Sequence, residues 1–135
     1  MVGSDTNEIA FGAGHELLEE FFKWMRESVG EMRSMVDEMP EHVMRGTDQV
    51  HRIYDLTHNI KGMGTSFDFG LMTEVGVSLC GHLKGMDEDT QVSRRVLASH
   101  VRTFEVILEH KIKGDGGEQG AALSRRLEAI ITEET

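Results

Sequence analysis

Apolar residues recur every three to four positions over four long stretches of the chain, a spacing that places them on one face of an α-helix. These stretches cover residues 15–39, 47–64, 68–85 and 90–112. A fifth, weaker stretch near the C-terminus carries Leu123, Leu127, Ile130 and Ile131 at helical spacing. The pattern therefore predicts an all-α chain of five helices.

A helix-ending proline and several N-terminal capping residues indicate where these helices begin and end. Pro40 ends the first helix, because a proline ring blocks the helical bonding pattern. The expected N-terminal caps of the next three helices are Thr47 with Asp48, Ser66 or Asp68, and Asp89 with Thr90. The short loops favour an antiparallel up-down-up-down four-helix bundle, with the additional C-terminal helix packed along it or over its end.

Two segments are expected in the chain. Residues 1–14 are small and polar and are expected to form a loose lead-in or a short helix, with Ile9 and Phe11 as candidate anchors. Residues 15–135 form the helical domain. With 135 residues in all, the chain has room for one hydrophobic core. A stripe of methionines on the first helix is expected inside this core; it consists of Met25, Met32, Met35 and Met39. Near the first loop, Met39 and Met44 are candidates for exposure.

Charge and cysteine content narrow the classes of function. The formal net charge of −10 argues against a nucleic-acid groove and against binding to an anionic membrane. The only cysteine, Cys80, cannot form an internal disulfide, and it lies on the expected inward face of the third helix. We therefore expect a protein of the reducing cytoplasm. No apolar run reaches the length of a membrane helix, and the first residues lack a basic segment followed by an apolar one, so we expect no export signal.

The second helix carries the most informative residues. His58, Lys61 and Gly62 are three and four positions apart and share one face, whereas Thr57 and Ile60 point to the core. An exposed neutral imidazole is a competent nucleophile at physiological pH, and an ammonium one turn away can neutralise phosphoryl oxygens. Glycine inside a helix is destabilising by about 0.5–1 kcal/mol relative to alanine, so two in this segment call for a reason. Gly62 and Gly64 would leave the imidazole open to a second protein.

These residues, His58-x-x-Lys61-Gly62-x-Gly64, resemble the H-x-x-K-G-x-(small) motif of histidine-containing phosphotransfer (HPt) domains. The apolar spacing of the following helix also matches that family, so the resemblance covers about residues 47–86 directly. By resemblance, His58 is the phosphorylated residue and Lys61 its electrostatic partner, with Gly62 and Gly64 as clearance positions and Lys84 as a second positive charge. The expected docking surface adds Tyr54, Asp55, Thr65, Phe67 and Phe69. Asp55 either orients the imidazole or is solvated. Two positions depart from the family pattern: Asp68 stands where a glycine is usual, and Cys80 where a polar residue is frequent.

The resemblance implies a phosphorelay carrier of bacterial two-component signalling and not an enzyme. It would exchange a phosphoryl group with response-regulator receiver domains or a hybrid histidine kinase, as a monomer without a cofactor, Mg²⁺ being supplied by the receiver. No Gly-rich phosphate loop is present, so phosphorylation from ATP alone is not expected.

Other functions remain open at this point. The chain could be a helical interaction module whose motif is vestigial, or the phosphoryl-accepting domain of a chemotaxis-type kinase. A metal site is not expected, because no Glu lies three residues before any histidine. We expect His82, His100 and His110 at helix boundaries or surfaces.

Overall fold

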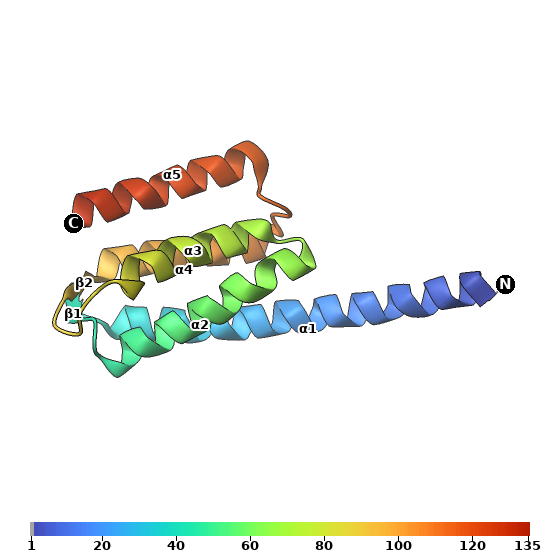
Figure 1. Ribbon diagram of the computed structural model, residues 1–135, viewed down its shortest axis with the longest axis horizontal. Helices are drawn as coiled ribbons and strands as arrows, with labels where there is room; N and C mark the ends of the chain where they lie inside the picture. Colours follow the sequence, from blue (N-terminus) through green and yellow to red (C-terminus); the bar gives the residue numbers. More distant parts are fainter. Residues whose placement is uncertain (1) are drawn as a thin grey trace.

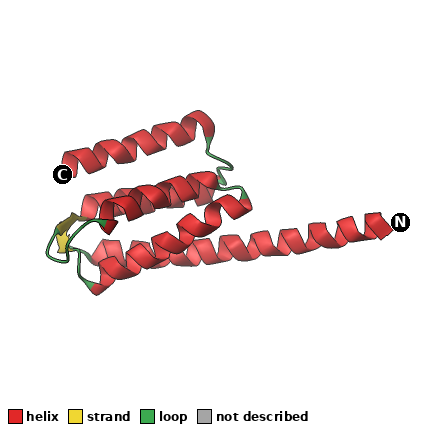
Figure 2. Ribbon diagram, viewed as in Figure 1, coloured by secondary structure: helices red, strands yellow, loops and turns green. Residues whose placement is uncertain are grey.

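The protein is described by a computed structural model that covers residues 2–135, with side chains from residue 14 onward. Over this range it is predominantly helical, which confirms the all-α class (Figures 1 and 2). The helices are α1 (Val2–Glu38), α2 (Asp48–Gly64), α3 (Gly70–Lys84), α4 (Arg94–His110) and α5 (Gly117–Glu134). The short elements are strands β1 (His42–Met44) and β2 (Gln91–Ser93) and a 3₁₀ turn, η1 (Thr65–Phe67).

The helices pack side by side, and the chain turns back at each loop between them (Figure 1). Helix α2 packs on α3, α1 on α4, and α3 on α4, while α5 covers the outer side of α3 and α4. Their inward faces form a single apolar core. Met25 and Met32 of α1 are completely buried there, as the methionine stripe predicted. Of the two candidates for exposure, Met44 is 48 % exposed, whereas Met39 is buried, so its expected exposure was wrong.

Helix α1 departs from the expected division of the chain. It runs without a break from Val2 to Glu38, so the boundary expected near residue 14 falls inside a helix. Its N-terminal part extends beyond the other helices (Figure 1). The expected anchors Ile9 and Phe11 lie outside the residues whose side chains are described, as does Met1. The other end agrees with the sequence, because α1 stops two residues before Pro40.

The N-terminal cap of α2 is the one predicted from the sequence, whereas the caps of α3 and α4 differ from the prediction. Thr47 caps α2, its side chain accepting a hydrogen bond from the Val50 N–H. Helix α4 begins later than expected, with Ser93 as its cap, because residues 91–93 form a strand. Helix α3 has Phe69 at its N-cap position and no side-chain capping bond, so neither Ser66 nor Asp68 serves as its cap.

A two-stranded antiparallel ribbon was not anticipated from the sequence. Strand β1 pairs with β2, with Val43 opposite Val92, and thereby joins the α1–α2 loop to the α3–α4 loop (Figure 2). Backbone bonds continue the pairing beyond the strands, since the Arg45 N–H donates to the Thr90 carbonyl at 2.8 Å. This end of the molecule is therefore held by both helix packing and strand pairing.

None of the helices in the described range is long and apolar enough to cross a membrane.

Candidate functional site

His58 lies on the exposed side of α2, close to the line along which α2 meets α3. Its imidazole makes no hydrogen bond or ion pair with any residue whose side chain is described. The space above Gly62, one turn further along, is open: a Cβ atom built there has nothing within 4 Å. The ring is therefore accessible to solvent and to a second molecule.

Helices α2 and α3 approach closely beside this ring. A Cβ atom on Gly76 would lie 2.9 Å from the Lys61 Cβ and 3.1 Å from its Cα, so only glycine fits at this crossing. The Thr73 hydroxyl donates to the Lys61 carbonyl at 2.9 Å and accepts from the Thr65 N–H at 3.1 Å. The sequence pattern puts Gly76 on the inward face of this helix, but the crossing with Lys61 and the role of Thr73 were not anticipated, although a glycine inside a helical pattern can have a packing reason.

Gly64 has a different role from the expected one. It is buried, and a Cβ atom there would meet the Thr73 Oγ1 at 2.5 Å and the Phe69 carbonyl oxygen at 2.7 Å. The missing side chain is required by the packing of α2 against α3 and its N-terminal turn. Gly64 therefore does not clear the approach to His58, a role that the structure leaves to Gly62.

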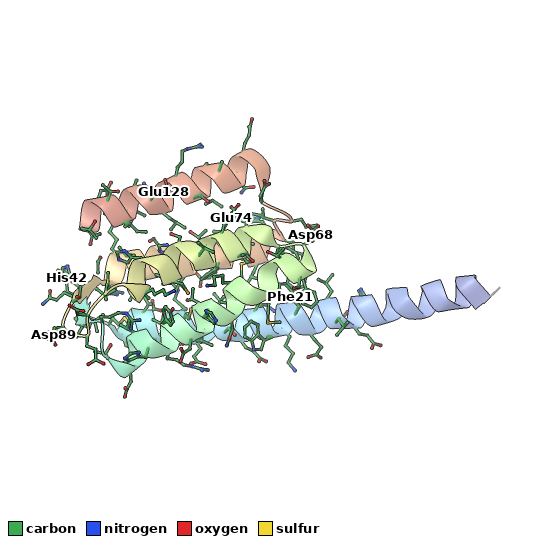
Figure 3. The ribbon with its side chains drawn as sticks, viewed as in Figure 1. Phe21, His42, Asp68, Glu74, Asp89 and Glu128 are labelled. Atoms are coloured by element: carbon green, nitrogen blue, oxygen red, sulfur yellow. The ribbon has the colours of Figure 1, made fainter. Side chains whose placement is uncertain are left out.

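The two phenylalanines expected in the docking surface are largely buried. Phe69 is 1 % exposed and packs against Phe21 and Phe22 of α1, so its assignment to a docking surface was wrong. Phe67 is half-buried, its ring stacked on Phe21 with centroids 4.4 Å apart. The aromatic pattern that looked like a surface patch is an extension of the core around the α2–α3 turn (Figure 3).

Asp68 occupies this turn in a left-handed conformation, with φ at 65° (Figure 3). Glycine adopts this region at least cost, and aspartate is among the few other residues that enter it readily. The Asp68 carbonyl accepts a bond from the Gly114 N–H at 2.7 Å, which ties the turn to the α4–α5 loop. Aspartate is therefore compatible with the left-handed backbone conformation of this turn.

Tyr54 and Arg45 extend the site away from the α2–α3 turn. The Tyr54 ring lies one turn before His58, with ring centroids 6.4 Å apart and planes 14° from parallel. The Arg45 guanidinium lies over the Tyr54 ring, 5.2 Å from its centroid, and its Nε–H donates to the Leu83 carbonyl at 2.9 Å. Arg45 is buried, and sequence reasoning missed it because the residues between α1 and α2 looked like an ordinary loop.

The positive charges at the site differ in their placement. Lys61 is half-buried beside Gly76. Lys61 lies against Gly76 and the two helices run in opposite directions, so His58 is opposite about residue 79 of α3. The exposed Lys84 lies five residues further along α3, about 7 Å along its axis. Burial raises the pKa of the Cys80 thiol, and the charges of Lys61 and Arg45 partly oppose that shift. Those two cations therefore act on the same part of α3.

The remaining expected residues are exposed. Asp55 and Thr65 both reach solvent. No bond joins Asp55 to the imidazole within the described side chains, whereas Thr65 is tied to Thr73 through its hydroxyl at 3.1 Å. Of the expected docking set, the structure gathers Tyr54, Asp55, Lys61 and Gly62 around His58.

A second histidine, His100, corrects the expectation that it would lie at a surface. It is 0 % exposed, its Nδ1–H donates to the Val96 carbonyl at 2.7 Å, and its Nε2 accepts from the Ser78 hydroxyl at 2.9 Å. This pairing fixes a neutral tautomer. Burial lowers the pKa of His100 to about 4. The signal was available, since His100 falls within the apolar stripe of α4 between Leu97 and Phe104.

One further region, between α3 and α5, holds polar groups. A groove of about 540 Å³ runs between α3 and α5, lined by Glu74 and Glu128 among others (Figure 3). In the described part of the chain, no three His, Cys, Asp or Glu side chains are grouped so that they could hold a metal ion.

The chain matches no protein-family profile, no curated protein and no solved structure. The residues around His58 are therefore the basis for assigning a function.

Proposed function

We propose that the protein is a phosphorelay carrier of the HPt type, which takes a phosphoryl group on His58 from a receiver-domain aspartate, or from a kinase, and passes it to another receiver. In this proposal α1 to α4 form the antiparallel four-helix bundle and α5 lies along it. The protein acts as a monomer in the cytoplasm, where ATP-driven kinases charge the relay. The supporting observation is an exposed His58 imidazole with open space above Gly62, and with Lys61 three residues further along the same face of α2.

The proposed transfer reaction requires only a few groups from the carrier. A ring nitrogen of neutral His58 attacks phosphorus, the N–P bond forms, and the P–O bond to the donor aspartate breaks with its electron pair going to the carboxylate. The proton on the other ring nitrogen stays in place or passes to water. Such transfers depend on alignment and on neutralising the equatorial oxygens. The receiver's Mg²⁺ supplies part of that charge, and Lys61 supplies the part contributed by the carrier.

The surroundings of His58 suit a transient encounter. Tyr54, Asp55 and Gly62 border the ring without covering it. A relay component has to release its partner after each transfer, so a small interface is sufficient. Lys84, at the C-terminal end of α3, is a second cation that the rim of such a partner can approach.

Transfer from a phosphorylated receiver tests the proposal. The wild-type protein is expected to gain an acid-labile, base-stable phosphate, and His58→Gln is expected to gain none. His51→Gln is the matched control, because His51 is also an exposed histidine of α2, and it should be labelled like the wild type. Lys61→Met should slow the transfer about 10-fold or more. Label that persists in His58→Gln would identify another acceptor.

The same experiment separates the two competing functions. A vestigial interaction module would bind its partner equally well with His58→Gln and take no label in any form. The accepting domain of a chemotaxis-type kinase would be labelled by a separate ATP-binding domain and ATP in the absence of any receiver. Incubation with kinase and ATP, with and without receiver, distinguishes these outcomes.

A further inference from the structure

Arg45 is held at both its backbone and its side chain. Its N–H donates to the Thr90 carbonyl at 2.8 Å, and its Nε–H donates to the Leu83 carbonyl at 2.9 Å. Leu83 lies in the last turn of α3, where a cation is favoured, and its carbonyl also accepts a bond from the Met86 N–H at 3.2 Å. The guanidinium of Arg45 is therefore fixed relative to α3, although the residue itself lies just before α2.

The fixed guanidinium in turn constrains Tyr54. Its carbon centre lies 5.2 Å from the centroid of the Tyr54 ring, within the range of an attractive cation–π contact. Tyr54 is half-buried. The cation–π contact with Arg45 therefore restricts the orientation of the Tyr54 ring.

His58 is the next ring in the series. Its plane is within 14° of the Tyr54 plane, and no hydrogen bond to a described side chain or backbone group orients it. An exposed imidazole without such a bond samples several side-chain rotamers. The neighbouring ring is thus the contact that favours one orientation, and a nucleophile held in its reactive orientation loses less entropy on reaching the transition state.

We infer that Arg45 is a positioning residue for His58: by holding the Tyr54 ring in place, it sets the orientation in which the imidazole meets a phosphoryl donor. The inference rests on the proposed function for its consequence in transfer, whereas the orientation itself is a property of the free protein. A purely structural role, as an anchor between the start of α2 and the end of α3, is the alternative.

A double-mutant cycle between Arg45 and Tyr54 separates these roles. Arg45→Met and Tyr54→Leu are each expected to slow transfer from a phosphorylated receiver about three- to ten-fold at saturation, with KM unchanged, because the nucleophile is less well oriented. In the Tyr54→Leu background, Arg45→Met should slow transfer no further. The loss of stability from the broken bond to Leu83 should appear in both backgrounds. Equal slowing in both backgrounds would overturn the inference.

The imidazole proton signals of His58 in NMR spectra give a readout that needs no donor. Tyr54→Leu removes the ring-current shift of these signals, and Arg45→Met should reduce it, whereas Tyr54→Phe should keep it. Arg45→Lys should restore part of it, because it keeps the cation without the planar fork. His58 signals that do not move in Arg45→Met would refute the inference.

Arg52→Met is the matched control, since Arg52 is an arginine of α2 that pairs with Glu31 of α1. It should leave both the His58 signals and the transfer rate unchanged. If Arg45→Met fails to fold, Arg45→Lys and the Tyr54 pair decide the question through the same signals. If the wild type never accepts a phosphoryl group, the proposed function fails, while the NMR cycle still confirms or refutes the orienting role.

Discussion

His58 and His100 are the same residue type in opposite environments. His58 lies on the open side of α2 with no hydrogen bond among the described residues, while His100 is completely buried with both ring nitrogens bonded. A buried imidazole that is neutral and fully bonded stabilises the fold and offers no free lone pair. An exposed one contributes little to stability and keeps its lone pair for chemistry. The contrast distinguishes a histidine with a structural role from one that is available for the proposed phosphoryl transfer.

The largest expected effect is a loss of folding stability at low pH, caused by the protonation of His100. His100 has a pKa of about 4 in the folded protein against an ordinary value of 6.5, so between these values the unfolded chain binds more protons. The contribution of His100 to the free energy of unfolding should therefore be fully present above pH 6.5. It should fall by about 3 kcal/mol as the pH drops to 4. Urea unfolding of the wild type and of His100→Gln measures this, because carboxylates contribute to both proteins alike. An equally steep acid dependence in His100→Gln would contradict the assignment.

Glycine-to-alanine changes compare the α2–α3 crossing with the open surface. Gly76→Ala places a methyl group against the Lys61 backbone and should destabilise by about 2 kcal/mol, the range of overpacked cores. Gly62→Ala meets no atom and should stabilise by about 0.5–1 kcal/mol, since alanine is the better helix former. Denaturation midpoints of the two variants are expected to move in opposite directions. A shift of the same sign in both would show that the crossing is looser than described.

Ser78→Ala tests the bonding of the buried ring. It leaves the His100 Nε2 without a donor and should cost about 1.5 kcal/mol. Ser124→Ala is the control, because Ser124 lines the same α3–α5 groove on the α5 side, and its loss should change stability by less than about 0.5 kcal/mol. Equal effects of the two changes on the unfolding midpoint would remove the special role of Ser78.

The smallest effect on stability is expected at His58. His58→Gln should change the free energy of unfolding by less than about 0.5 kcal/mol, as for other surface substitutions, because the ring has no hydrogen bond to lose. Thermal unfolding checks this on the same sample that fails to accept phosphate. A large destabilisation would mean that the loss of labelling reflects misfolding.

Helix content and the exposure of His58 were predictable because both follow from periodicity within a single helix. Thr47 as a cap and Pro40 as a stop are likewise local signals, and the structure agrees with them. The buried state of Phe69 was not predictable in the same way, because it depends on Phe21 and Phe22 from α1.

Long-range pairing accounts for most of the other differences. Strands β1 and β2 have three residues each and no extended alternation, and they are brought together only when their helices assemble. Arg45 acquires its role from Leu83, which is distant in sequence. His100 is the exception, since its place in the apolar stripe of α4 was visible and was misread as a boundary position.

Tyr54 is the only tyrosine of the chain, and Trp24 of α1 its only tryptophan. The tyrosine chromophore therefore has a single location, beside His58 and beneath a guanidinium. Any change in the charge or hydration of that neighbourhood alters the near-ultraviolet absorption of one identifiable phenol. The protein thus carries a natural optical reporter at the position where its partner is expected to dock, and encounters can be followed without attaching a dye.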